Sequence, residues 1–401
     1  MGPAGSGDAG EMRSMVKVTV VMPVYNAAKY IRKSLGDVLA QTMEDLEVIC
    51  VDGGSRDGTV KIIRSFMERD SRVRLLSGNR ITTGEAKNRG IREAKGEYIT
   101  FWDADDRFRH RYLARMAAKM DETGADVAVC GADVFDGAGE LYDTAAFLET
   151  EKLPDRDPFS WRDMPENIFD FATNNAWNKM FRRRFLLDRG IRFQNLVRAE
   201  DTVFVMSAMF LAERITWVDE KLVMYRRYNA DSLTGRTSDY PLATYASFVY
   251  TREKLAEYPD FPAVLPGFQR RVLKGLLKSL DAQRTWDGYL RNYQVLQEEG
   301  LALFGLDTLP EESVPAGMYR KRLRWIRTMG PEDYLLATMR QYRTASEKNR
   351  FRLRRETEKN MHGIDDPEER RRTERVLRAE QFLRRGFRKL VHRLHGDERA
   401  K

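Results

Sequence analysis

Residues 96–106 read Gly-Glu-Tyr-Ile-Thr-Phe-Trp-Asp-Ala-Asp-Asp, an apolar run that ends in three carboxylates. The run from Tyr98 predicts a buried strand, and Asp103, Asp105 and Asp106 follow at its carboxyl end. Residues two apart in extended backbone project to the same side, so Asp103 and Asp105 are expected to face one point. A hard divalent cation relieves the repulsion of two such charges and also binds phosphate oxygens. The stretch predicts a site for a metal and a phosphorylated ligand at the edge where open α/β sheets bind ligands. The simpler alternative is a capped strand end, since Asp is common in turns.

Strand and helix patterns alternate on both sides of this stretch. Upstream, β-branched and apolar runs predict strands, and apolar residues at helical spacing between them predict helices. The upstream strands are expected at 17–23, 46–51 and 73–76, and a helix at 111–123 and a strand at 126–130 follow downstream. Such alternation predicts a mostly parallel sheet with helices on both faces, an α/β fold.

The second half of the chain is expected to be mainly helical. Helical spacing is found at 178–189 and 201–212, and a strand-rich segment follows at 215–228. Beyond it only helical spacing occurs, with prolines such as Pro262 and Pro266 as expected helix boundaries.

Composition divides the chain of 401 residues into three regions. We expect a disordered extension at 1–15, an α/β catalytic domain at 16–238, and a helical region with a basic amphipathic tail at 239–401. The net charge is +8, and residues 346–401 alone hold 18 Lys and Arg against 11 Asp and Glu. The basic character therefore belongs to the tail and says little about the α/β domain.

Cysteine usage and hydropathy suggest a cytoplasmic protein. Cys50 and Cys130 lie in apolar runs typical of buried strands, as expected for small thiols in a reducing compartment. Metal binding by Cys and His is not expected, because there is no Cys-x-x-Cys pair and only four His. No signal peptide is evident, and no apolar run reaches the roughly 20 residues of a membrane span.

Several short motifs, taken in order, resemble those of the inverting glycosyltransferases of family 2. They are Val20-Val21-Met22-Pro23-Val24-Tyr25-Asn26, Val51-Asp52-Gly53-Gly54-Ser55-Arg56-Asp57-Gly58-Thr59, Gly84-Glu85-Ala86-Lys87-Asn88-Arg89-Gly90-Ile91, Asp103-Ala104-Asp105-Asp106, Trp177-Asn178-Lys179, Glu200-Asp201 and Tyr225-Arg226-Arg227. The resemblance covers roughly residues 17–235 and implies the GT-A fold of nucleotide-diphospho-sugar transferases.

The resemblance also implies which residues bind the donor, a nucleotide-diphosphate sugar, with a UDP-sugar as the expected class. These residues are Pro23, Val24, Tyr25, Asp52, Gly53, Lys87, Asp103, Ala104 and Asp105. In the family, Asp105 would ligate Mn²⁺ or Mg²⁺, and Asp106 would orient its neighbour. An aromatic ring such as Tyr25 fits a flat base, and the Asp52 carboxylate fits a base N–H or a ribose hydroxyl, although strand-end packing and turn formation explain both as well.

On the acceptor side, the resemblance implies that Asp201 is the general base of a single displacement, because inversion needs one base opposite the leaving group. Glu200 would position a hydroxyl. Trp177, Lys179 and Arg227 are further acceptor or supporting residues by resemblance. The alternatives remain that Glu200 and Asp201 only complement a helix dipole and that Trp177 is a buried anchor.

Two positions depart from the family pattern. The family usually has two adjacent acids where this chain has Asp52 and Gly53, and it usually has Arg at the position of Lys87. Lys keeps the charge but loses the planar two-pronged donor. Lys87 is therefore expected either near the phosphates or base of the donor, or as a solvated charge on its helix.

The predicted function is metal-dependent, inverting transfer of a sugar to a hydroxyl of a glycan or lipid-linked acceptor. A non-catalytic nucleotide- or glycan-binding relative is the alternative, and Gly53 is the motif loss that favours it. A sugar nucleotidyltransferase is disfavoured, because the loop after the first strand has no Gly and no basic residue before Lys29. No nucleic-acid partner is expected.

The tail contains a basic amphipathic pattern at 376–394. Such a helix fits an anionic membrane surface, with a helix packed on the catalytic domain as the alternative. We expect a cytoplasmic protein with possible peripheral association at the inner face of the membrane.

Overall fold

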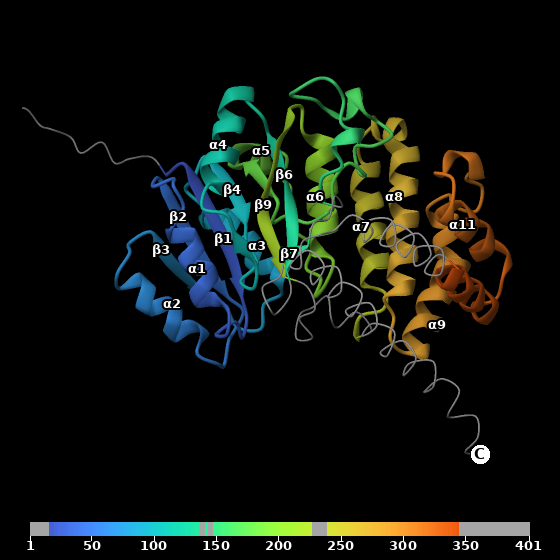
Figure 1. Cartoon of the computed structure of the whole chain (residues 1–401), viewed down its shortest axis with the longest axis horizontal. Helices are drawn as coiled ribbons and strands as arrows, with labels where there is room; N and C mark the ends of the chain where they lie inside the picture. Colours follow the sequence, from blue (N-terminus) through green and yellow to red (C-terminus); the bar gives the residue numbers. More distant parts are fainter. Residues whose placement is uncertain (1–15, 136–140, 143–146, 227–238, 345–401) are drawn as a thin grey trace, which may run out of the picture. The chain divides into compact units, whose positions relative to one another are not determined.

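A mixed sheet of nine strands forms the centre of the α/β part (Figure 1). The computed structural model describes residues 16–135, 141–142, 147–226 and 239–344. The strand order is β3-β2-β1-β4-β8-β6-β9-β5, and β7 (Leu141–Tyr142) pairs with β6 outside this path. The extension predicted at 1–15 and the tail predicted at 376–394 lie outside the described residues.

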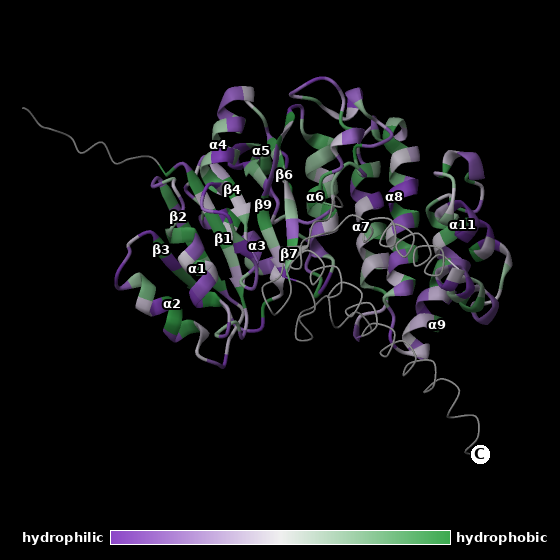
Figure 2. Ribbon diagram, viewed as in Figure 1, coloured by the Kyte–Doolittle hydropathy of each residue, from purple (hydrophilic) through white to green (hydrophobic). Residues whose placement is uncertain are grey.

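Four neighbouring strands are parallel and contain the motifs of the donor side. They are β3 (Val73–Ser77), β2 (Leu46–Asp52), β1 (Val18–Val24) and β4 (Tyr98–Phe101). All seven residues of β2 and all four of β4 are buried, as expected for strands covered on both faces. Hydrophobic residues accordingly follow the central strands (Figure 2). Their predicted positions are confirmed to within two residues.

The rest of the sheet contains antiparallel strand pairs, whereas the sequence predicted a mostly parallel sheet. β8 (Lys179–Arg182) is antiparallel to both β4 and β6 (Val127–Phe135), β5 (Arg107–Phe108) is antiparallel to β9 (Ile215–Arg226), and β7 is antiparallel to β6. Only β6 and β9 run parallel in this half. The prediction of one helix at 178–189 was therefore wrong in its first part, because Lys179–Arg182 fills the gap between β4 and β6. The short helix α5 (Arg183–Asp188) follows directly.

Helices cover the two faces of the sheet, and alternate residues of β1 contact different layers. Val20 and Met22 belong to the core that includes residues of α1 (Ile31–Leu39), α2 (Thr59–Met67) and α4 (Tyr112–Thr123). Val21 points the other way, toward Gly90 of α3 (Thr83–Glu93). On that second face Phe101 packs edge-on against Phe204 of α6 (Glu200–Leu211).

The residues after 239 are helical as far as they are described. α7 (Ala243–Ala256) packs along α6, α8 (Phe261–Asp281) packs along α7, and α9 (Trp286–Val295) and α11 (Met318–Thr328) pack against α8, with the short α10 (Leu301–Leu303) between them in sequence (Figure 1). The buried Arg322 of α11 makes two 2.7 Å hydrogen bonds to Asp281 of α8. Pro266 lies inside α8, so the expectation that it marks a helix boundary was wrong, whereas Pro262 stands in the first turn as expected.

The chain divides into two compact units, residues 1–328 and 329–401. The first unit contains the sheet together with the helices through α11. The boundary predicted at 238/239 falls beside a segment that is not described and stays a prediction. In the part of the chain that is described, none of the helices combines the length and apolar character needed to cross a bilayer.

Candidate active site at the carboxyl edge of the sheet

Three of the predicted donor segments meet at one edge because their strands are parallel and in register. Val24 at the end of β1 pairs with Asp52 at the end of β2, and Val21 pairs with Phe101 of β4. The chain leaves these strands through Tyr25, Gly53 and Trp102, which leads to Asp103. The structure thus brings these residues to one edge of the sheet, as predicted, and the binding of a ligand there stays a prediction.

Asp52 shapes the turn after β2. Its buried carboxylate accepts hydrogen bonds from the backbone N–H groups of Gly54 and Ser55, at 3.2 Å and 3.1 Å. Tyr25, in contrast, is 64% exposed, so its ring is available to a ligand. The turn-forming alternative for Asp52 is therefore present in the structure, and its contact with a nucleotide stays a prediction.

Gly53 is not required by packing. A Cβ at this position would lie 3.4 Å from the Ile81 carbonyl oxygen and 3.6 Å from the Tyr25 Cβ, which is ordinary van der Waals contact. The loss of an acid at this position is therefore a change in chemistry beside Tyr25 rather than a consequence of a crowded backbone.

The acidic stretch after β4 divides into two parts with different surroundings. Asp103, Ala104 and Asp105 keep some exposed surface, whereas Asp106 is 1% exposed. The Asp106 Oδ1 accepts the Arg226 backbone N–H at 2.7 Å, and the Arg226 Nε donates to the Asp105 carbonyl at 2.8 Å. Asp106 and Arg226 together fasten the acidic stretch to the end of β9. The sequence analysis missed this role of Arg226, although the residue stands inside one of the quoted motifs.

Lys87 lies next to the predicted base and not in solvent. Its Nζ donates to the Asp201 Oδ1 at 2.6 Å and to the Glu200 Oε1 at 3.0 Å, and its side chain is 3% exposed. The alternative of a solvated helix charge was therefore wrong, because α3 packs with this face against the start of α6. Burial opposes the charge, but Asp201, Glu200 and Asp103 raise the pKa of Lys87 well above its usual range.

Asp201 and Glu200 begin α6 immediately after a strained residue. Ala199 precedes the helix with φ 64°, a left-handed conformation that is uncommon for residues with a Cβ. The Asp201 Oδ2 accepts the backbone N–H of Ala176 at 3.1 Å. The side chain of Asp201 is 18% exposed, so part of the carboxylate remains reachable from outside.

The carboxylates of this site influence one another. Burial raises the pKa of Asp103 to about 7, with Asp201, Asp105 and Glu200 adding to the rise and Lys87 opposing it. Burial, with a contribution from Asp201, also raises the pKa of Glu200, and Lys87 again opposes the shift. The carboxylates of Asp103, Asp105, Glu200 and Asp201 thus act on one another beside the buried Lys87, and such oxygens suit a hard cation.

The donor set fits a hard divalent cation only in part. The carboxylates of Asp103 and Asp105 are oxygen ligands of the kind that Mg²⁺ and Mn²⁺ prefer, and the nearby Asp106 Oδ2 is buried with no hydrogen-bond partner among the described residues. Within the described ranges, however, no group of three or more Asp, Glu, His or Cys side chains is arranged to hold a metal. A cation at this edge would therefore need oxygens from the ligand as well as from Asp105.

Trp177 and Lys179 are buried, unlike the open acceptor contacts that the sequence analysis predicted. The Trp177 ring is 2% exposed and stacks on Tyr225 at a centroid distance of 5.2 Å, which leaves little surface for a sugar. The Lys179 Nζ donates to the carbonyls of Thr173 and Asn175, both at 2.7 Å. Arg227 lies outside the described residues. Any acceptor contact of these three side chains stays a prediction.

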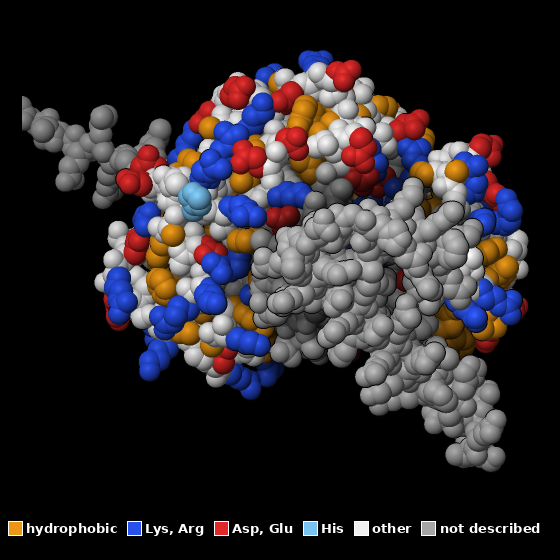
Figure 3. Space-filling model, viewed as in Figure 1, with side chains coloured by type: hydrophobic (Ala, Val, Ile, Leu, Met, Phe, Trp, Pro, Cys, Tyr) orange, Lys and Arg blue, Asp and Glu red, His pale blue; other side chains and the backbone are white. Residues whose placement is uncertain are grey.

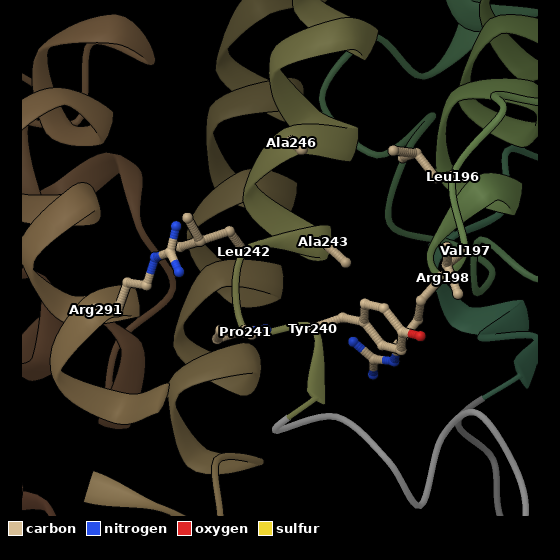
Figure 4. A pocket seen from close by; sticks show the side chains of 9 residues that line it. All are labelled: Leu196, Val197, Arg198, Tyr240, Pro241, Leu242, Ala243, Ala246 and Arg291. Atoms are coloured by element: carbon tan, nitrogen blue, oxygen red, sulfur yellow. The ribbon is translucent and has the colours of Figure 1, made fainter. Parts of the chain in front are cut away.

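A separate pocket of about 320 Å³ opens between the segment before α6, the start of α7 and α9 (Figure 4). Its wall is mostly apolar, with Leu196, Leu242 and Ala246 among the lining residues, and it includes Arg198. Arg198 precedes Glu200 by two residues, so this pocket adjoins the predicted base in sequence.

Comparison with known proteins identifies the family. The family model "Glycosyl transferase family 2" matches residues 19–187. GlyG, a glycosyltransferase of Streptococcus pneumoniae, is 32% identical over 219 residues, which are 52% of this chain and 70% of GlyG. This chain belongs to glycosyltransferase family 2. Glycosyltransferase GlyA of the same organism is 28% identical over 218 residues, which are 52% of this chain but 30% of GlyA.

A solved structure supports the fold of this glycosyltransferase. The crystal structure of residues 1–349 of S. aureus TarS aligns with a TM-score of 0.60 and 21% identity, over 79% of this chain and 89% of that chain. The same TarS fragment has been crystallised in complex with UDP-GlcNAc. The predicted family 2 membership and GT-A fold are thus confirmed. The individual site residues of this glycosyltransferase stay predictions that rest on their geometry.

Proposed function

We propose that this glycosyltransferase moves a sugar from a UDP-sugar to a hydroxyl of a glycan or lipid-linked acceptor, with inversion and with the help of a divalent cation. The observation that carries the proposal is that Asp103, Glu200 and Asp201 act on the buried Lys87 at the carboxyl edge of the sheet, with Asp105 acting on Asp103. UDP-GlcNAc bound to the structurally similar TarS supports a uridine donor.

Three of these carboxylates have a proposed part in the transfer step. The acceptor hydroxyl oxygen attacks the anomeric carbon while the bond from that carbon to the diphosphate breaks. Asp201 takes the hydroxyl proton, and the bonding electrons leave with the nucleoside diphosphate. Asp103 is proposed to hold sugar or ribose hydroxyls, and Asp105 the cation. When bound, Mn²⁺ or Mg²⁺ would neutralise charge that develops on the leaving diphosphate.

The donor class is tested by thermal shift of the full chain with UDP, GDP and CDP, each with and without Mn²⁺. UDP with Mn²⁺ is expected to stabilise the protein, by about 2.7 kcal/mol at a hundredfold excess over Kd, because it binds only the folded state. A shift with one of the other nucleotides would change the donor class. If none of the three nucleotides shifts the melting temperature, the non-catalytic reading replaces this proposal.

The base is tested by Asp201→Asn. The variant is expected to lose about 10²–10⁴-fold in kcat, because an amide cannot accept the acceptor proton, while donor binding changes little. Asp188→Asn is a matched control, since Asp188 lies in α5 with its side chain 62% exposed. Normal turnover of Asp201→Asn would show that the base is a different residue.

A further inference from the structure

One face of α3 holds the segment that leads into α6. Asn88 and Phe193 form a reciprocal pair, in which the Asn88 Nδ2 donates to the Phe193 carbonyl and the Phe193 N–H donates to the Asn88 Oδ1, each at 2.9 Å. At the start of the same helix, the Thr82 Oγ1 donates to the Asn195 Oδ1 at 2.6 Å. These contacts join residues more than one hundred positions apart in the sequence.

The close approach of α3 to this segment requires a residue without a side chain. A Cβ at Gly84 would lie 1.9 Å from the carbonyl oxygen of Gln194, far inside van der Waals contact. Phe193 is held from its other side, because its ring stacks on Phe204 of α6 at a centroid distance of 3.8 Å. The path of the chain toward Glu200 and Asp201 is therefore fixed by α3 and by the core.

Lys87 stands at the centre of this contact. Its Nζ lies 5.0 Å from the centroid of the Phe193 ring and bonds to the Glu200 and Asp201 carboxylates. An ammonium group buried to this extent loses its hydration, so it persists only where carboxylates and an aromatic face replace the water. These three contacts of its charged end are with residues of the segment 193–201, which ends at Asp201.

We infer that Lys87 is a positioning residue that orients and supports the general base Asp201, rather than a residue that binds the donor. This inference rests on the proposed function, and it departs from the donor role that the family resemblance implied for this position. The motif from Gly84 to Asn88 then supports the general base. Gly84 and Asn88 fix the path of the chain toward α6, and Lys87 fixes the orientation of the Asp201 carboxylate.

The geometry explains how such support works. Lys87 and the Ala176 N–H each hold one oxygen of Asp201, which fixes the plane of the carboxylate without covering its exposed edge. The charged groups that act around Asp201 are Lys87 from α3, Glu200 from its own helix, Asp103 from the end of β4 and Lys179 from β8. Two of these four are acids, so removal of Lys87 takes away the ammonium group that holds the Asp201 carboxylate in place between them.

The test compares Lys87→Met with Lys87→Arg in the full chain. Calorimetry with UDP and Mn²⁺ measures nucleotide affinity. Hydrolysis of UDP-GlcNAc, with water as the acceptor and UDP as the detected product, measures turnover. GDP and GDP-mannose replace UDP and UDP-GlcNAc if GDP gives the thermal shift. For Lys87→Met we expect unchanged nucleotide affinity and a fall in kcat of about 10- to 100-fold, as for other residues that orient a reacting group. Lys87→Arg keeps the charge and is expected to recover part of kcat.

Two controls separate positioning from folding. Arg89→Met changes a basic residue of the same helix that forms an ion pair with Glu85, and is expected to change neither kcat nor nucleotide affinity. Because Lys87→Met leaves buried acids without their counter-ion, Lys87→Met combined with Glu200→Gln removes one positive and one negative charge together. If Lys87→Met does not fold, kcat and nucleotide affinity of the double variant are compared with those of Glu200→Gln instead.

Three results would overturn the inference. Nucleotide affinity that falls tenfold or more in Lys87→Met would assign Lys87 to the donor. An unchanged kcat would assign Lys87 to folding alone. In both cases the proposed function stands, because the wild type still binds the nucleotide with Mn²⁺. A wild type that binds no nucleoside diphosphate contradicts the proposed function and this inference together.

Discussion

Single residues at this site are held by surroundings that the sequence does not reveal. Lys179 illustrates the point: burial lowers the pKa of its ammonium group to about 7, yet three oxygens lie around its Nζ, from Thr173, Asn175 and Asn178. Three acceptors match the three N–H donors of the charged form. Lys179 thus fixes the loop that gives the Ala176 N–H to Asp201. The sequence did not predict this role of Lys179, because two of its three partners are backbone carbonyls of the loop.

The raised pKa of Asp103 makes stability depend on pH. Its ordinary pKa is 3.8, and burial followed by the neighbouring carboxylates raises it to about 7 in the fold. Between these values the folded chain binds more protons than the unfolded chain, so the free energy of unfolding falls as the pH rises. We expect urea unfolding in EDTA to show lower stability at pH 7.5 than at pH 5.5, and Mn²⁺ with UDP to reduce the difference.

Asp103→Asn serves as the control for this pH dependence, because the amide does not titrate. The free energy of unfolding of this variant should therefore change less steeply with pH. Carboxyl groups whose pKa is lowered, such as Asp170, lose protons in both states by pH 5.5 and contribute below that range. Equal slopes for the wild type and Asp103→Asn would show that Asp103 does not titrate in this window.

Secondary-structure elements were predictable where their pattern is local. The strands that became β1, β2 and β3 are bounded by turn residues, and the sequence placed them well. The strand β8 was missed because Lys179–Arg182 passes without a turn into the helical pattern of α5. Pairing with β4 and β6 decides its conformation, and that pairing is not local. For the same reason the sequence left open whether Lys87 is solvated, since the partner segment lies 113 residues away.

The contact of α3 with the Gln194 backbone predicts opposite effects for one substitution at two helical glycines. Gly84→Ala puts a methyl group into the Gln194 carbonyl and is expected to cost about 1–3 kcal/mol, because neither backbone yields easily. Gly36→Ala in α1 meets no atom within 4 Å and is expected to gain up to about 1 kcal/mol from helix propensity. Urea midpoints of both variants measure the two effects. Equal midpoints would refute the tight contact.

Charge is distributed unevenly along the molecule as a whole. Acidic and basic side chains are interspersed over the described surface in Figure 3, while the net charge of +8 belongs almost entirely to residues 346–401. An excess of Lys and Arg is attracted by anionic lipid surfaces and is screened by salt. Because acceptors linked to lipid would be found at such a surface, the tail is the part of the chain that we propose for membrane association.

Flotation with vesicles checks this proposal for the tail. The full chain is expected to float with vesicles that contain phosphatidylserine at low salt, and to stay behind with neutral vesicles or at high salt. A chain that ends before Asp365 is expected to lose the association and to keep nucleotide binding. The proposal for the tail is abandoned if neither form associates with anionic vesicles.

The contacts between α3 and the beginning of α6 also limit which chimeras of this enzyme and its relatives can be active. The family match ends at residue 187, whereas Asp201 lies beyond it. A chimera joined near residue 187 takes α3 from one parent and the segment that α3 contacts, residues 193–201, from the other. Such hybrids should work only when both parents agree at Gly84, Lys87 and Asn88, or when α3 is exchanged together with the downstream half.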